Sequence, residues 1–357
     1  MSLEHPLLKE YHYPAAEIER LIESYRTGNL KQENNIISGM LKCPAEDDFI
    51  SLPPVPSGEY GRLKQRGIES ISKGELGIVI LNGGMGTRFG GLVKGAVEVF
   101  DGLSFLELKI KETSKVSPEI KLFIMNSFAT SAKTEQLLND KGYFGVPGSI
   151  KMFNQYIAPR IDEKGSYLRS ETGIDAFYGP GHGDFPYAFR DSGLLDEFLS
   201  SGGKYIFFSN VDNLGARVAP VILGFHIEQN CELTAEVALK DPGDEGGAPA
   251  IVDGKLQLVE GFCFPENFDQ SQIPVFNCST YWVNAESLKK DFSLPWYLVK
   301  KQVAGQDVIQ FEHLAGDMTK FLSTLFLKVA RKERFYPIKR PEDLEEKRQV
   351  LKKILGF

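Results

Sequence analysis

Cysteine is scarce in this sequence, with 4 among 357 residues. Cys43, Cys231, Cys263 and Cys278 are too widely spaced to form the C-x-x-C pair that is typical of zinc and redox sites. This argues against a cysteine-bound zinc ion and against a disulfide-stapled secreted domain. We therefore expect reduced thiols in a cytoplasmic protein.

Positive charge and long apolar runs are also in short supply. The 41 Lys and Arg are outnumbered by 48 Asp and Glu, which gives a net charge of −7 and disfavours a general nucleic-acid binder. No apolar run reaches the roughly 20 residues of a membrane-spanning helix. The first residues, which include Glu4 and Lys9, lack the apolar region of a signal peptide. We therefore expect this protein to bind neither nucleic acids nor membranes.

Glycine, by contrast, is concentrated in one stretch. The apolar run 76–81 is typical of a buried parallel strand, and five glycines then follow within the nine residues 83–91. Glycine lets several backbone N–H groups approach one anion, and Arg88 and Lys94 add positive charge. The pattern predicts a phosphate-binding loop, and the alternative is a loop that merely needs tight turns.

The spacing of these glycines excludes two common phosphate loops. A dinucleotide fingerprint that starts at Gly84 and Gly86 requires a third glycine where Phe89 stands. A P-loop requires Gly-Lys followed by Ser or Thr, and that sequence does not follow here. The loop therefore belongs to a third type.

Apolar strand candidates alternate with helical stretches between 73 and about 290, which predicts an α/β fold with a mainly parallel sheet and helices on both faces. The expected strands are 77–81, 121–125, 205–209, 233–239 and 280–283, and the expected helices are 106–115, 133–140, 193–199 and 219–230. A β-hairpin is expected at 251–259. We predict three parts: a helical N-terminal appendage (1–72, with helices at 18–25 and 35–41), a catalytic core (73–290), and a basic, helical C-terminal segment (291–357) that ends in a helix at 342–355.

Polar clusters follow several of these strands, at the edge of the sheet where α/β proteins bind ligands. Gln155 offers the donor and acceptor that a pyrimidine edge requires, although such a residue often lies on a surface. His182 stands among glycines in 178–184, and Asp212 follows the strand 205–209, where one carboxylate can hold Mg²⁺ beside phosphates. The simpler alternative for Asp212 is a turn residue. We expect His226 to be structural and find no supporting cluster around His313.

The string Gly-Gly-x-Gly-Thr-Arg followed by lysine resembles the signature of sugar-nucleotide pyrophosphorylases, and in particular of the UTP–glucose-1-phosphate uridylyltransferase family. Further segments resemble that family in the same order: 125–128, 153–155, 159–160, 180–184, 192–196, 209–215, 258–260, 276–277 and 337–339. The resemblance implies a Rossmann-like nucleotidyltransferase core. It also implies that UTP and glucose 1-phosphate are converted to UDP-glucose and pyrophosphate with Mg²⁺.

The resemblance also assigns roles to individual residues. The implied nucleotide-binding residues are Leu81, Asn82, Gly83, Gly84, Gly86, Thr87, Arg88, Gln155 and Gly181. The implied sugar-phosphate-binding residues are His182, Asn210, Glu260 and Asn277. Lys94, Asp212 and Lys339 are the implied catalytic residues, and Asp212 is the implied metal ligand.

Three departures from the family keep alternatives open. Val93 precedes Lys94 where the family often has proline, and Asn277-Cys278-Ser279 replaces its Asn-Thr-Asn. The chain also stops before the C-terminal β-helix of eukaryotic members, so its oligomeric state stays open. The alternatives are a UDP-N-acetylglucosamine or broad UDP-sugar pyrophosphorylase and an inactive nucleotide-sugar-binding protein. A glycosyltransferase is a further one, although such enzymes commonly use Asp-x-Asp and this chain has Asn-Val-Asp-Asn.

Overall fold

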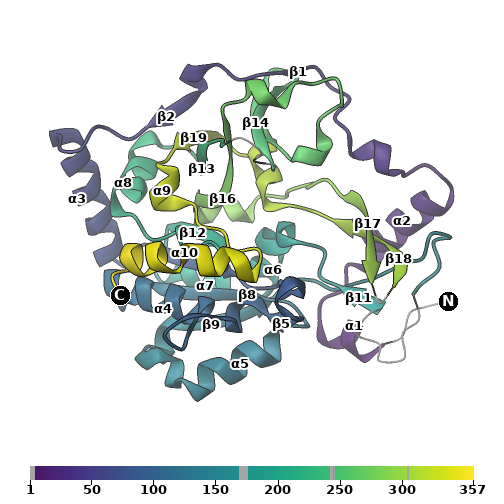
Figure 1. The fold of residues 1–357 in the computed structure, drawn as a ribbon, viewed down its shortest axis with the longest axis horizontal. Helices are drawn as coiled ribbons and strands as arrows, with labels where there is room; N and C mark the ends of the chain where they lie inside the picture. Colours follow the sequence, from purple (N-terminus) through teal and green to yellow (C-terminus); the bar gives the residue numbers. More distant parts are fainter. Residues whose placement is uncertain (1–4, 169–175, 242–243, 245, 304) are drawn as a thin grey trace.

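The computed structural model describes residues 5–168, 176–241, 244, 246–303 and 305–357. An eight-stranded sheet runs through its centre (Figure 1). The order of its strands is β2 (Phe49–Ser51), β19 (Thr324–Lys328), β13 (Leu233–Leu239), β16 (Val275–Asn284), β12 (Tyr205–Asn210), β3 (Leu76–Leu81), β8 (Lys121–Asn126) and β9 (Ile150–Asn154). Strand β16 is antiparallel to both of its neighbours, and the other pairings are parallel. The predicted α/β fold with a mainly parallel sheet is confirmed.

Two apolar cores cover the two faces of this sheet because side chains alternate along each strand. Ile78 and Ile80 of β3 pack in a core with α3 (Gly58–Ser72), α4 (Phe105–Val116), α5 (Ser131–Asp140), α8 (Pro220–Gln229) and α10 (Pro341–Leu355). Val79 and Leu81 belong to the opposite core, with α6 (Phe185–Asp191) and α7 (Leu194–Ser200). The four predicted core helices are present within one or two residues of their expected ends.

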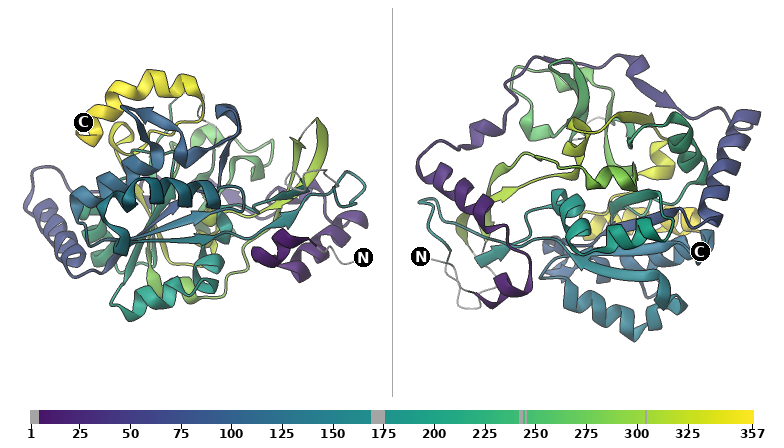
Figure 2. Two further views of the ribbon diagram at one scale, coloured as in Figure 1. Left: turned by 90° about the horizontal axis from the view of Figure 1, so that it is seen from below. Right: turned by 180° about the vertical axis from the view of Figure 1, so that it is seen from behind.

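The N-terminal helices α1 (Pro6–Glu10) and α2 (Ala15–Arg26) lie at the end of the molecule opposite to α3 (Figures 1 and 2). The predicted helix 18–25 is confirmed, and its apolar residues Ile18 and Ile22 are buried against a hairpin formed by β17 (Tyr297–Val303) and β18 (Gln306–Glu312). The predicted helix 35–41 is wrong. A short 3₁₀ turn ends at Asn35, and the chain then extends into β1 (Leu41–Lys42), which pairs with β14 (Ala248–Val252).

The expectation of a helical segment after residue 290 holds only for its last part. Strands β17, β18 and β19 come first, with a 3₁₀ helix at Ala315–Lys320 before β19, and α-helix in the described part of this segment is confined to α9 (Arg331–Arg334) and α10. Val299, Val303, Val308 and Ile309 explain the difference, because β-branched side chains favour strands. Strands β2 and β19 join the central sheet from the first and last predicted parts, and the limits of independently folding units stay a prediction.

The remaining strands form smaller sheets of two or three strands. The predicted hairpin 251–259 is confirmed as β14 and β15 (Lys255–Val259), with φ of 49° at Asp253 and 85° at Gly254, as a two-residue type I′ turn requires. The others are β4 (Met85–Gly86) with β5 (Leu92–Val93), β6 (Glu98–Phe100) with β7 (Leu103–Ser104), and β10 (Ala158–Pro159) with β11 (Phe177–Tyr178). Within the described residues, no helix combines the length and the apolarity that a membrane span needs.

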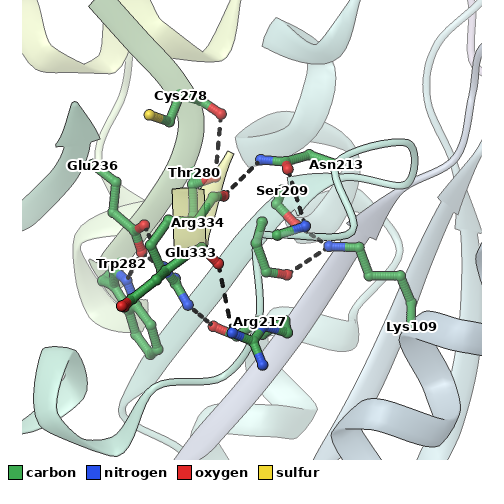
Figure 3. Close-up of polar contacts among 12 residues, drawn as sticks. Lys109, Ser209, Asn213, Arg217, Glu236, Cys278, Thr280, Trp282, Glu333 and Arg334 are labelled. Carbon is green, nitrogen blue, oxygen red and sulfur yellow. Dashed lines mark hydrogen bonds and ion pairs between the residues drawn. The ribbon is translucent and has the colours of Figure 1, made fainter. Parts of the chain in front are cut away.

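A buried ion pair ties the C-terminal part of the chain to the sheet (Figure 3). Arg334 Nε and Nη2 donate to the two carboxylate oxygens of Glu236 on β13, at 2.8 and 2.5 Å. Trp282 Nε1 on β16 donates to the same carboxylate at 2.9 Å, and Arg334 Nη1 donates to the Arg217 carbonyl at 2.7 Å. The side chain of Glu236 is completely buried and that of Arg334 is 8% exposed, so each charge depends on the other.

We expect Arg334→Met to lower the free energy of unfolding by about 3–5 kcal/mol, because it leaves the Glu236 carboxylate buried without its counter-charge. The measurement is the urea midpoint of the variant against the parent protein. Lys352→Ala is the matched control: it breaks the exposed pair with Asp101 and should cost less than about 1 kcal/mol. Equal effects of the two substitutions would contradict the role given to the buried pair.

Candidate functional site

The carboxyl ends of four neighbouring strands meet at one edge of the sheet. The register sets Asn210 of β12 opposite Leu81 of β3, and Asn126 of β8 opposite Asn154 of β9. Hydrogen bonds continue this alignment into the loops, from the Asn82 amide to the Met125 carbonyl at 2.8 Å and from the Gln155 amide to the Asn126 carbonyl at 2.8 Å. The glycine loop, Gln155 and the loop with Asp212 are therefore brought to one place, as the sequence predicted.

The glycine loop forms a small hairpin at this edge. Strands β4 and β5 pair, and between them a turn passes through Gly90 and Gly91, whose φ angles of 71° and 78° suit glycine. Beneath the hairpin lies Asn82, fully buried, with its Nδ2 donating to Asn126 Oδ1 at 2.8 Å and to Thr134 Oγ1 at 2.9 Å. Its side chain supports the base of the loop and does not face a cleft. The side chain of Thr87 lies outside the described part of the structure.

Lys94 and Asp212 form an ion pair between the glycine loop and the end of β12. The two residues are 118 positions apart in the sequence, and their side chains are 17% and 18% exposed. The pair places the predicted cation and the predicted metal ligand in direct contact at the centre of the site.

Gln155 is nearly buried between two glycines that its side chain requires. A Cβ at Gly179 would lie 1.6 Å from Gln155 Nε2, and a Cβ at Gly83 would lie 2.9 Å from its Oε1. Gly181, at φ 117°, makes a similar close approach, since its Cβ would lie 2.5 Å from the His313 carbonyl oxygen. Gly83 and Gly179 thus let the backbone pass close to the Gln155 side chain, and Gly181 lets it pass close to His313.

His182 is held as a neutral hydrogen-bond donor. The Ala315 amide donates to His182 Nδ1 at 2.9 Å, which leaves the ring proton on Nε2. Burial, with a smaller contribution from His313, lowers the pKa of His182 to about 4. At neutral pH the imidazole is uncharged, so it can donate to a phosphate or hydroxyl oxygen without acting as a cation.

The interpretation of His313 as a residue without a supporting cluster is wrong. Its Nε2 pairs with Asp184 Oδ1 at 2.5 Å, and its ring stacks on Trp296 at 4.1 Å between ring centroids. Asp184 in turn accepts the Tyr156 amide at 3.0 Å. Because these partners are distant in the sequence, no local pattern indicated the cluster, which fixes the loop that carries His182.

His226 is structural, as the sequence predicted. It is buried, and its ring nitrogens contact Thr234 Oγ1 at 2.9 Å and Asn284 Oδ1 at 3.1 Å. Burial lowers its pKa to about 4, opposed by the hydrogen bond with Asn284.

Lys339 reaches the site through the backbone of the C-terminal part. The Ile338 amide donates to the Asp212 carbonyl at 3.2 Å, and the Lys339 amide donates to Asp343 Oδ2 at 2.7 Å. The side chain of Lys339 lines the same two clefts as that of Arg88. The extended backbone between Pro337 and Pro341 thus carries this lysine to the glycine loop.

Three adjoining clefts surround the glycine loop, with volumes of ≈ 1210, ≈ 970 and ≈ 340 Å³. All the predicted site residues except Asn82 and Thr87 line at least one of them: Leu81, Gly83, Gly84, Gly86, Arg88, Lys94, Gln155, Gly181, His182, Asn210, Asp212, Glu260, Asn277 and Lys339. Gln155 lies in the two smaller clefts, and Glu260 and Asn277 lie in the largest one. Lys94 and Asp212 stand between these two ends.

Two of the four implied sugar-phosphate-binding residues, Asn277 and Glu260, differ in how many of their polar atoms are free to bind a ligand. Asn277 uses its amide internally, since Oδ1 accepts the Ser279 amide at 2.9 Å and Nδ2 donates to the Tyr281 hydroxyl at 2.8 Å. Burial, reinforced by Asp317 and opposed by Lys320, raises the pKa of Glu260 to about 7. The Glu260 carboxyl can therefore offer either a donor or an acceptor near neutral pH.

Sequence reasoning missed the contribution of the β17–β18 hairpin. Lys301, Gln310 and Glu312 line the ≈ 970 Å³ cleft opposite the glycine loop. The signal was present as β-branched residues in 299–309, which the prediction of a helical segment passed over.

Comparison with known proteins gives a consistent family. The family model of UTP–glucose-1-phosphate uridylyltransferase matches residues 28–350. The chain is 32% identical to the enzyme of that name from Encephalitozoon cuniculi over 287 residues, which is 76% of this chain and 57% of the relative. It is also 32% identical to the Pyrus pyrifolia enzyme over 362 residues, which is 92% of this chain and 74% of the relative.

A solved structure agrees with this result. The structure described as UDP-glucose phosphorylase from Trypanosoma brucei superposes with a TM-score of 0.76 at 25% identity and covers 96% of this chain and 76% of its own. The chain thus belongs to the UTP–glucose-1-phosphate uridylyltransferase family.

Proposed function

We propose that this protein converts UTP and glucose 1-phosphate to UDP-glucose and pyrophosphate. The observation that carries the proposal is the meeting of Lys94, Asp212 and Lys339 around one loop, between Gln155 at one end and Glu260 at the other. The curated relatives bear the name of this reaction, and the chain spans between 57% and 74% of the length of the two described above.

The reaction requires two anions to meet in line. An oxygen of the sugar phosphate attacks the α-phosphorus of UTP, the bond from that phosphorus to the bridging oxygen breaks, and pyrophosphate leaves with the electron pair. The second pKa of a phosphate ester is about 6, so the nucleophile is already ionised at neutral pH and no general base is needed. The residues of this site then have to position the reactants and stabilise negative charge.

The residues divide these tasks by their place in the site. Gln155 presents a donor and an acceptor to the uracil edge, and the glycine loop presents N–H groups to the phosphates. Neutral His182 donates from Nε2, and Glu260 binds sugar hydroxyls. Lys94 and Lys339 carry the positive charge that offsets the charge developing on the α-phosphate and on pyrophosphate.

The donor set fits Mg²⁺ carried in with the nucleotide. Among the described residues, no group of three or more His, Cys, Asp or Glu side chains is arranged to hold a metal. Mg²⁺ commonly takes one or two carboxylates together with substrate phosphates and water, and Asp212 at the end of β12 offers such a carboxylate. When bound there, the ion would act as a Lewis acid and a template for the phosphates.

The cytoplasmic location of the protein stays a prediction.

A second candidate is a pyrophosphorylase for another sugar, such as N-acetylglucosamine 1-phosphate or a broad range of sugar 1-phosphates. It is favoured by the state of Asn277, whose amide is engaged by Ser279 and Tyr281 and has little left for a sugar. An inactive nucleotide-sugar-binding protein is the third possibility, and the retention of Lys94, Asp212 and Lys339 speaks against it.

We expect pyrophosphate release from UTP with Mg²⁺ and glucose 1-phosphate, to be compared with galactose and N-acetylglucosamine 1-phosphates. Chelation of the divalent ion should abolish release and its readdition should restore it. Faster release with another sugar would replace glucose in the proposal. Binding of UTP without any release, in folded protein, would favour the inactive binder.

We expect Lys94→Ala and Lys339→Ala each to lower kcat by on the order of 10²-fold or more, because each removes charge that stabilises the transition state. The readout is steady-state pyrophosphate release, with the urea midpoint measured in parallel. Lys352→Ala removes a lysine outside the clefts and should leave kcat unchanged. Full turnover in either of the first two variants would exclude that lysine from catalysis.

A further inference from the structure

We propose that Asn213 is a positioning residue that holds the segment carrying Lys339 against the loop carrying Asp212. The inference rests on the proposed function, because it gives Lys339 its task. Asn213 directly follows Asp212, is 3% exposed, and makes contacts with both segments.

One side chain binds both its own loop and the C-terminal part. Asn213 Oδ1 accepts the Gly215 amide at 3.2 Å and the Tyr336 amide at 2.9 Å. Its Nδ2 donates to the Arg334 carbonyl at 3.4 Å (Figure 3). The bond to Gly215 closes a local turn, which any isolated turn asparagine would do. The bonds to Tyr336 and Arg334 serve no such local purpose, since those residues are more than a hundred positions away.

The loop that carries Asn213 is fixed from the other side by a buried lysine. Lys109 on α4 donates to Ser209 Oγ at 3.1 Å and to the Ala216 carbonyl at 2.6 Å (Figure 3). These two hydrogen bonds hold the chain before and after Asn213. Burial lowers the pKa of Lys109 to about 7, with Glu112 the largest opposing influence. Asn213 therefore lies in a loop that Lys109 holds on both sides of it.

Several contacts hold the backbone of the C-terminal segment on either side of Lys339, whose side chain is exposed. Arg334 is anchored on Glu236, Lys347 Nζ donates to the Pro337 carbonyl at 3.0 Å, and the Ile338 amide donates to the Asp212 carbonyl at 3.2 Å. Gly215 allows the close approach, since a Cβ there would lie 2.6 Å from the Arg334 carbonyl carbon. The place of the ammonium therefore depends on how these two backbones are joined, and Asn213 is the side chain next to Asp212 that joins them.

The test is a double-mutant cycle between Asn213→Ala and Lys339→Ala, read by pyrophosphate release. If Asn213 acts through Lys339, we expect Asn213→Ala alone to lower kcat by on the order of 10-fold to 10²-fold, and to cost little more when Lys339 is already alanine. KM for UTP should change much less than kcat. Effects that multiply in the double variant, or an unchanged kcat in Asn213→Ala, would overturn the proposal.

A conservative variant and a control separate positioning from general destabilisation. Asn213→Asp keeps the acceptor for Tyr336 and should retain most of kcat; a loss as large as that of Asn213→Ala would overturn the proposal. Lys352→Ala breaks the contact of α10 with Asp101, and neither residue lines the three clefts, so kcat should stay unchanged. A similar loss in this control would also count against a specific role.

Amide hydrogen exchange gives a readout that does not depend on activity. In the parent protein the Tyr336 and Ile338 amides should be protected, and Asn213→Ala should speed their exchange while amides of β12 stay protected. Should Asn213→Ala fail to fold, Asn213→Ser takes its place in the cycle and in the exchange measurement. If the parent protein releases no pyrophosphate, the proposed function is wrong, whatever the exchange measurement shows. If Asn213→Ala leaves the exchange rate of the Tyr336 amide unchanged, the positioning role of Asn213 is overturned.

Discussion

The parallel register of β12, β3, β8 and β9 is the constraint on which the rest of the site depends. Hydrogen bonding sets Asn210 opposite Leu81 and Asn126 opposite Asn154, so the loops after these strands begin at one edge. A shift of one residue in any pairing would turn its side chains to the other face and move the following loop. The two apolar cores prevent such a shift, because each needs alternate residues of β3 on its own side.

The local charge around the glycine loop is opposite in sign to the net charge of the protein. The chain carries a net charge of −7, yet Arg88, Lys94 and Lys339 gather around the glycine loop. Two titratable groups of the site have pKa values shifted by burial: His182 is neutral, and Glu260 titrates near 7. The low pKa of His182 removes a potential cation, and the raised pKa of Glu260 lowers the negative charge that would repel phosphates. The positive charge around the glycine loop is therefore supplied by Arg88, Lys94 and Lys339.

Much of the core and of the site could be predicted because the signals are local. The apolar residues of β3 form one short run, and the glycines of 83–91 form another. The two residues Asp253-Gly254 are enough to predict the turn of their hairpin. The hairpin β17–β18 also carries a local signal in its β-branched residues, although the segment 291–357 as a whole is basic and ends in a helix. The buried position of the Asn82 side chain could not be predicted, because a loop residue that faces the interior and one that faces a ligand look the same in sequence.

The sequence by itself determined the kinds of groups in the site and the order in which the chain supplies them. Only the tertiary structure decided which of them meet. The pair Lys94–Asp212 joins residues 118 apart, the pair Asp184–His313 joins residues 129 apart, and Lys339 reaches the site because the Ile338 amide bonds to the Asp212 carbonyl. Local propensities act over a few residues, whereas these contacts exist only after the sheet has closed and the buried Arg334–Glu236 pair has docked the C-terminal part upon it.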